Sequence, residues 1–208
     1  MRQGRLSGWQ GDAQLPFHAD AGCETMTTTA FWKALYTAGH DTACLTQTNE
    51  GWVLEGTAVY LKDALPTALN YQLSLAPGWE TRTGSIKGFL GGAQVNHDIQ
   101  RDGDGWLLNG KRQGGLEGVV DLDFGFTPAT NFAQLRRMDL SVGEKTEITV
   151  AWMDVDSVSL EPLPQIYERL SEDTYDYNSP QGPYRATLKL QATGFVRLYP
   201  ELWEADFN

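Results

Sequence analysis

The chain has 208 residues and a formal net charge of −11, with 41% hydrophobic and 21% charged residues. This length and balance predict one folded domain with a substantial core rather than a disordered chain. The excess of acidic residues argues against a nucleic-acid or anionic-membrane partner, because both need a basic face.

No apolar run reaches membrane-spanning length, and the N-terminal stretch lacks the apolar centre of a signal peptide. The two cysteines, Cys23 and Cys44, provide neither a disulfide framework nor a zinc site. These features predict a cytoplasmic protein without an integral membrane segment, metal or cofactor. They predict no particular oligomeric state.

Residues 1–30 are rich in Gly, Gln, Thr and Ala and show no periodicity, which predicts a loose extension. One domain is expected over residues 31–208. Met26 lies just before the first patterned segment and is a candidate for the true start of translation, so residues 1–25 need not belong to the native product.

From Phe31 onward, short stretches rich in β-branched and aromatic residues are separated by Gly, Asp and Asn turns. No window of helical length shows apolar residues at a 3.6-residue period. The pattern predicts an all-β fold, a single antiparallel meander with little helix. The expected strands are Phe31–Tyr36, Asp41–Gln47, Trp52–Lys62, Ala68–Leu75, Glu80–Leu90, Gln94–Arg101, Trp106–Asn109, Gly118–Phe126, Gln134–Leu140, Glu147–Val155, Ser159–Leu170, Thr174–Asn178, Tyr184–Gln191 and Gly194–Leu198.

The predicted strands differ in how their faces are patterned. Tyr184–Gln191 alternates apolar with polar residues, as a strand with one wet face does. Glu147–Val155 is apolar on both faces and must be covered on both. A sheet curved around side chains or a ligand provides that cover.

The densest polar cluster lies between Gly114 and Glu144. Asp121 and Asp123 share one face of the expected strand Gly118–Phe126, opposite an apolar face. Their Cα atoms would lie only about 6.5–7 Å apart, which permits acid–base catalysis, as in glycoside hydrolysis. A solvated or arginine-paired outer face is the simpler interpretation.

The rest of this cluster is a turn and a pair of basic residues. The turn Thr127–Asn131 predicts either a structural corner or, through Thr130 and Asn131, hydrogen bonds to sugar hydroxyls. Arg136 and Arg137 would face opposite sides of an extended strand, so that one could pair with an aspartate and the other stay exposed. A clamp on an anionic headgroup is the alternative.

The chain resembles a bacterial family of putative glycolipid-binding proteins from about Ala30 to its end. The central matching segments are LEGVVDLDFGFTPATN at Leu116–Asn131 and LRRMDLSVGE at Leu135–Glu144. Further matches are Trp106–Gly110, Ala151–Asp154, Leu160–Leu170, Tyr175–Tyr177, Gly194–Val196 and Tyr199–Trp203. The resemblance implies an open antiparallel β half-barrel, similar in shape to periplasmic lipoprotein carrier and acceptor proteins.

The leading hypothesis is non-enzymatic binding of a glycolipid or other amphiphile on the concave face of this half-barrel. We expect polar headgroup contacts from Asp121, Asp123, Thr130, Asn131 and Arg137. Apolar or stacking contacts are expected from Trp152, Tyr167, Tyr175 and Tyr177. Two alternatives stay open: a small hydrolase, lyase or isomerase that uses Asp121 and Asp123, and an interaction module that adds a partner strand to an open sheet edge.

Overall fold

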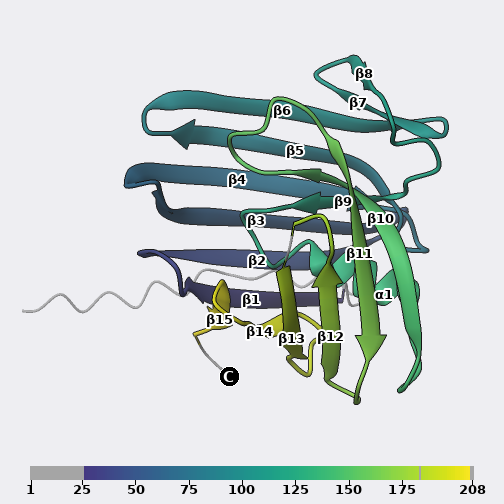
Figure 1. The fold of residues 1–208 in the computed structure, drawn as a ribbon. Coiled ribbons are helices and arrows are strands. Elements are labelled where there is room, and N and C mark those ends of the chain that lie inside the picture. Colours follow the sequence, from purple (N-terminus) through teal and green to yellow (C-terminus); the bar gives the residue numbers. More distant parts are fainter. Residues whose placement is uncertain (1–25, 183, 207–208) are drawn as a thin grey trace, which may run out of the picture.

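A computed structural model describes residues 26–182 and 184–206 (Figure 1). Nearly all of this region is β-strand, with one short helix. The strands are β1 (Thr27–Ala34), β2 (Gly39–Thr48), β3 (Gly51–Lys62), β4 (Leu65–Leu75), β5 (Thr81–Leu90), β6 (Ala93–Asp102), β7 (Gly105–Leu108), β8 (Lys111–Gln113), β9 (Asp121–Phe124), β10 (Lys145–Met153), β11 (Glu161–Arg169), β12 (Thr174–Ser179), β13 (Tyr184–Leu190), β14 (Val196–Tyr199) and β15 (Trp203–Ala205). The helix α1 spans Asn131–Met138.

The strands form one open sheet in the order β8-β7-β6-β5-β4-β3-β2-β1-β15-β14-β13-β12-β11-β10-β9. Two meanders therefore meet where β1 pairs with β15, so that the first and last strands of the described chain lie together in the middle of the sheet. Figure 1 shows the second meander running across the face of the first. The predicted all-β, open and curved sheet is confirmed.

One strand pair departs from the predicted antiparallel pattern. β9 runs parallel to β10, with Asp121 opposite Val150 and Phe124 opposite Met153. Parallel neighbours need a crossover connection, and this one contains α1. The expected strand Gln134–Leu140 is wrong, because Gln134 to Met138 belong to α1.

The strand boundaries correct the sequence analysis at both ends of the chain. β1 begins at Thr27, so residues 27–30 belong to the sheet rather than to the expected extension. The short strands β8 and β15 were not predicted. The rest of the expected extension, residues 1–25 with Cys23, lies outside the described residues.

The space enclosed by the curved sheet is largely filled by large buried side chains. Trp32, Phe126 and Phe132 are each at most 2% exposed. Trp32 packs edge-on against Phe195, and Phe132 lies 4.6 Å from the same ring. The concave face is therefore mostly a packed core, and a ligand can use only the openings that remain at its borders.

Both outer edges of the sheet are protected against adding a partner strand. The outer edge of β9 is covered by Thr81, whose backbone N–H donates to Val120 and whose hydroxyl accepts from the backbone of Leu122. The opposite edge, β8, has only three residues, among them the charged Lys111 and Arg112. Short and charged edges disfavour strand addition, so the geometry does not favour the interaction-module hypothesis.

Candidate functional site

The polar cluster predicted from the sequence lies where β9, the turn Thr127–Asn131 and α1 meet. All four residues of β9 are buried. Leu122 and Phe124 enter the core, while Asp121 and Asp123 bond to side chains of the turn and of α1. Of the two simpler interpretations, the solvated face is wrong, because the following turn and helix cover both aspartates, whereas arginine pairing holds for Asp121.

Asp121 forms a bidentate salt bridge with Arg137 of α1. The Arg137 Nε donates to Asp121 Oδ1 at 2.8 Å, and its Nη2 donates to Oδ2 at 2.6 Å. The two parallel hydrogen bonds raise the pKa of the Arg137 guanidinium. Arg136 points elsewhere and stays exposed, where it lies over the Phe132 ring. The prediction that one arginine pairs with an aspartate is thus confirmed.

Asp123 has no cationic partner among the described residues. Its Oδ1 accepts from the Thr130 hydroxyl at 2.6 Å, and its Oδ2 accepts from the Gln165 amide at 2.8 Å. Burial raises the pKa of Asp123, although these neutral donors pull it down. A carboxylate can accept about four hydrogen bonds, and Thr130 and Gln165 supply two.

Buried amides and hydroxyls form a hydrogen-bond network that holds Asp123 in position. Gln165 accepts from the Tyr167 hydroxyl at 3.1 Å, and Tyr167 in turn accepts from Asn131 at 3.0 Å. Thr130 occupies the N-cap position of α1 but makes no capping hydrogen bond with its side chain. Its hydroxyl donates to Asp123 instead. Thr130 therefore positions the aspartate and does not cap the helix with its side chain.

The turn also holds a second buried carboxyl, from the other half of the sheet. The Thr127 hydroxyl donates to Asp41 of β2, and the Tyr71 hydroxyl donates to the same carboxyl. Burial raises the pKa of Asp41 to about 8. The two threonines of this turn therefore each bind one buried aspartate, Thr127 the one on β2 and Thr130 the one on β9.

A pocket of about 450 Å³ opens beside Asp123, a size within the range of small-molecule sites. Asp123, Ser179 and Tyr177 are buried residues of its lining, whereas Glu161 and Gln181 are exposed. The pocket lies inside the curve of the second meander. The lining consists of Asp123, Phe124, Gly125, Thr127, Asn131, Trp152, Glu161, Pro162, Leu163, Tyr177, Ser179, Gln181, Gly182, Tyr184, Tyr199, Leu202 and Trp203.

Aromatic rings make up much of the wall of this pocket. Tyr177, Tyr184 and Tyr199 pack against one another with centroids 5.5 to 6.2 Å apart. Trp152 and Trp203 line the same pocket. Burial raises the pKa of Tyr184 to about 12, so its hydroxyl is protonated at neutral pH. A wall of rings beside a buried carboxyl suits a ligand that has both apolar faces and hydroxyl groups.

The structure brings some of the nine expected ligand residues to this pocket. Asp123, Asn131, Trp152 and Tyr177 line it. Thr130 and Tyr167 lie behind the wall in the network that positions Asp123 and Asn131. Three others lie apart from it: Asp121 and Arg137 bind each other, and Tyr175 lines a separate cavity under Arg169.

Sequence reasoning missed several residues of the pocket. Tyr184, Tyr199 and Trp203 come from three strands at the end of the chain, and Ser179 ends β12. Trp203 belongs to the matched segment Tyr199–Trp203 but carried no predicted role. These side chains reach Asp123 only because β12, β13, β14 and β15 pair one after another in the sheet. No local sequence pattern predicts that they lie near Asp123.

The structure does not support the hydrolase hypothesis, which needs Asp121 and Asp123 in one site. Asp121 is occupied by Arg137 and does not line the pocket, whereas Asp123 does. A second carboxyl, Glu161, lies at the exposed rim. The residues described contain no cluster of His, Cys, Asp or Glu that could hold a metal ion.

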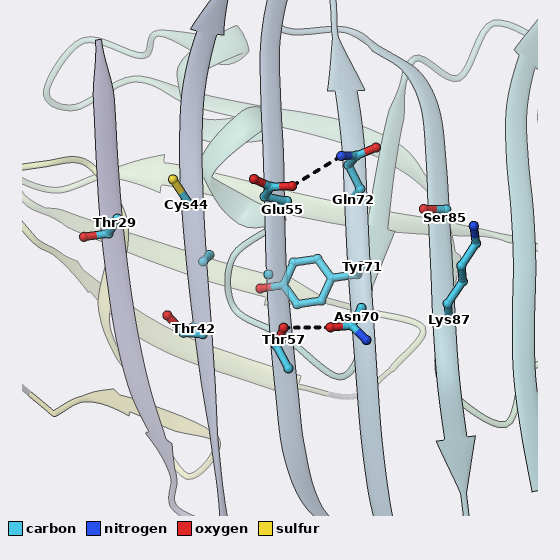
Figure 2. Close-up of a pocket in the computed structure, with 12 residues that line it drawn as sticks. Thr29, Thr42, Cys44, Glu55, Thr57, Asn70, Tyr71, Gln72, Ser85 and Lys87 are labelled. Atoms are coloured by element: carbon cyan, nitrogen blue, oxygen red, sulfur yellow. Dashed lines mark hydrogen bonds between the residues drawn. The ribbon is translucent and has the colours of Figure 1, made fainter. Parts of the chain in front are cut away.

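A shallower groove of about 420 Å³ crosses the outer face of β1 to β5 (Figure 2). Its side chains are mostly small and polar and bond to one another across the strands. Thr57 donates to Asn70 at 2.9 Å, and Gln72 donates to Glu55 at 3.4 Å. This arrangement is typical of the solvated face of an antiparallel sheet. The pocket beside Asp123 is therefore the better candidate site.

Comparison with known families identifies the fold. A family model described as putative glycolipid-binding matches residues 29–205. The chain belongs to this family. A crystal structure of a DUF1089 family protein from Pseudomonas aeruginosa has the same fold, with a TM-score of 0.68 and 22% identity over 97% of this chain and 99% of that one. No functionally curated protein matches the chain.

The family assignment confirms the resemblance found in the sequence and agrees with the open β-sheet. The match includes β9, α1 and every described residue of the pocket beside Asp123. Within the described part of the chain, no helix has the length and apolar character needed to span a membrane.

Proposed function

We propose that the pocket beside Asp123 binds the headgroup of a glycolipid or a similar amphiphile without chemical conversion. The observation that carries the proposal is the buried Asp123 carboxyl, which has no cationic partner and forms part of a pocket lined by Trp and Tyr rings. Sugar hydroxyls donate to carboxylates, while the apolar face of a sugar stacks on aromatic rings. The family description supports the same class of ligand.

Trp152 and Tyr184 are the expected stacking residues, because both are partly exposed within the pocket. Asn131 is the second polar contact from the wall. Its amide is oriented by Tyr167 and Gln134, so it meets the ligand in a fixed direction. An acyl chain would leave through the rim near Leu163 and Pro162. In a cytoplasmic protein, the ligand would come from the inner leaflet or from another intracellular amphiphile.

Native mass spectrometry of the purified protein, combined with lipid extraction and a panel of glycolipids, tests the proposal. We expect a bound glycolipid on the wild-type protein and weaker retention in Asp123→Asn and Trp152→Ala. Phe89→Ala is the matched control, since Phe89 is an exposed aromatic residue on β5 outside the pocket. No bound lipid and no affinity for any member of the panel would contradict the proposal.

A further inference from the structure

A smaller cavity of about 170 Å³ adjoins the pocket beside Asp123. Gly125, Leu202 and Trp203 line both spaces. The far wall of the small cavity comes from Tyr36, Tyr60, Lys62 and Asp154. Tyr60 and Lys62 belong to β3, so the first meander contributes to this cavity, whereas the larger pocket is lined mainly by the second.

Tyr60 has a polar group for which the protein supplies no partner. Its side chain is 3% exposed, and its hydroxyl is buried without a hydrogen bond among the described residues. An unsatisfied buried hydroxyl destabilises a folded protein, and most are paired. Burial raises the pKa of Tyr60, so the hydroxyl remains a donor at neutral pH. This donor is available to a ligand that enters the cavity.

The charges around the cavity indicate what kind of group would fit. Lys62 Nζ lies 3.3 Å from Asp154 and 3.7 Å from Asp156, so its positive charge is already matched. A phosphate or sulfate would meet two carboxylates and no free cation. The ion pair of Lys62 and Asp154 also disfavours an acyl chain, because hydrocarbon would remove its hydration and replace it with nothing. A neutral group with several hydroxyls suits this lining.

We propose that the small cavity receives a second sugar unit of the same ligand, with a hydrogen bond from the Tyr60 hydroxyl. The inference rests on the proposed function and narrows its ligand class to alkyl or acyl glycosides with at least two sugar units. The first unit lies beside Asp123 and Trp152, and the second lies beyond Gly125.

Gly125 is one of the residues at the border of the two spaces. A Cβ atom at this position would lie 2.8 Å from the Trp152 indole. The missing side chain lets the ring lie directly against the backbone at the border of the two spaces. The site therefore has an aromatic ring, a glycine and the Trp203 ring where the two sugar units would be joined.

Calorimetric titration with octyl β-glucoside and octyl β-maltoside, below their micellar concentrations, tests the inference. The two probes share the chain and differ by one sugar unit. We expect the wild-type protein to bind the maltoside more tightly. Tyr60→Phe should weaken maltoside binding about three- to tenfold, the usual effect of one hydrogen bond, and leave glucoside binding unchanged. Its Tm should stay the same or rise, because an unpaired hydroxyl is removed.

Tyr71→Phe is the matched control. Tyr71 is also a buried tyrosine, but its hydroxyl donates to Asp41 and it lies outside both spaces. This variant should lower the Tm and leave the ratio of the two affinities unchanged. Equal wild-type affinities for both glycosides, or an unchanged maltoside affinity in Tyr60→Phe, would overturn the inference but not the proposed function. If neither glycoside bound, both would fail.

Discussion

Arg137 of α1 and Asp121 of β9 bind each other through two hydrogen bonds of 2.8 and 2.6 Å. The Asp121 side chain is 2% exposed and that of Arg137 is 24% exposed. The pair fixes the helix against the last strand of the sheet. It also fixes the turn that carries Thr127, Thr130 and Asn131 between them, so the wall of the pocket beside Asp123 depends on it.

Replacing Arg137 by Ala should lower the free energy of unfolding by about 3–5 kcal/mol, because Asp121 would remain buried without its partner. Arg137→Lys should lie between wild type and Ala, since an ammonium group cannot reproduce the paired geometry. Urea denaturation measures both. The neighbouring Arg136→Ala is the control and should cost less than about 1 kcal/mol, as expected for an exposed residue. Similar losses at both positions would show that the ion pair is not the cause.

Asp41 should make the protein less stable as the pH rises. Its pKa is raised from 3.8 to about 8, chiefly by burial, so the folded protein binds this proton more tightly than the unfolded chain does. The stabilisation from this tighter proton binding is complete below about pH 4. It is lost as the pH rises to about 8, and the free energy of unfolding then falls by at most about 1.4 kcal/mol per pH unit. Removing the carboxyl should remove this slope.

The test is urea denaturation of wild type and Asp41→Asn between pH 5 and 8.5. The difference in unfolding free energy between the two proteins should change steadily with pH, in favour of Asp41→Asn at high pH. Asp98→Asn, at an exposed position on β6, should follow the wild-type curve in parallel. A constant difference between wild type and Asp41→Asn would mean that the buried carboxyl does not titrate in this range.

Gly56 on β3 should not tolerate a larger residue. A Cβ atom there would collide with the Tyr71 ring and with the carbonyl oxygen of Thr42 on the neighbouring strand. Figure 2 shows the Tyr71 ring extending from β4 towards β3. Gly56→Ala should therefore cost about 1–3 kcal/mol, as overpacked core positions do, and displace Tyr71 from Asp41.

The matched control for Gly56→Ala is Gly114→Ala. A Cβ atom at Gly114 meets nothing within 4 Å, and its backbone does not require a glycine. Thermal denaturation should show a clear fall in Tm for the first variant and almost none for the second. Equal Tm values for Gly56→Ala and wild type would contradict the close packing of Tyr71 on β3.

The sequence predicted most strands because their apolar and polar residues alternate and their turns contain Gly, Asp or Asn. The sequence did not predict α1, because this helix has only eight residues and its buried face includes the polar Asn131 and Gln134. Those side chains bond to Tyr167 rather than to water. A helix that buries amides shows no apolar period, so a sequence pattern cannot identify it.

Because sequence patterns are local, they predicted only some residues of the candidate site. Asp123 and Asn131 belong to the polar cluster between Gly114 and Glu144, and Trp152 and Tyr177 were expected as aromatic contacts; all four line the pocket. Tyr184, Tyr199 and Trp203 reach the pocket only because the second meander returns to β1. The pairing of Arg137 with Asp121 could be predicted from charge, but the choice between Asp121 and Asp123 depended on how α1 is oriented.

The most direct test of the binding site is photo-crosslinking with a glycolipid that carries a diazirine at the start of its acyl chain. Labelled peptides are then identified by mass spectrometry. Binding beside Asp123 predicts labels within residues 152–163 and 177–203, and unlabelled octyl maltoside should compete them away. Labels confined to the outer groove of β1 to β5, or labels that no glycoside displaces, would contradict the proposed site.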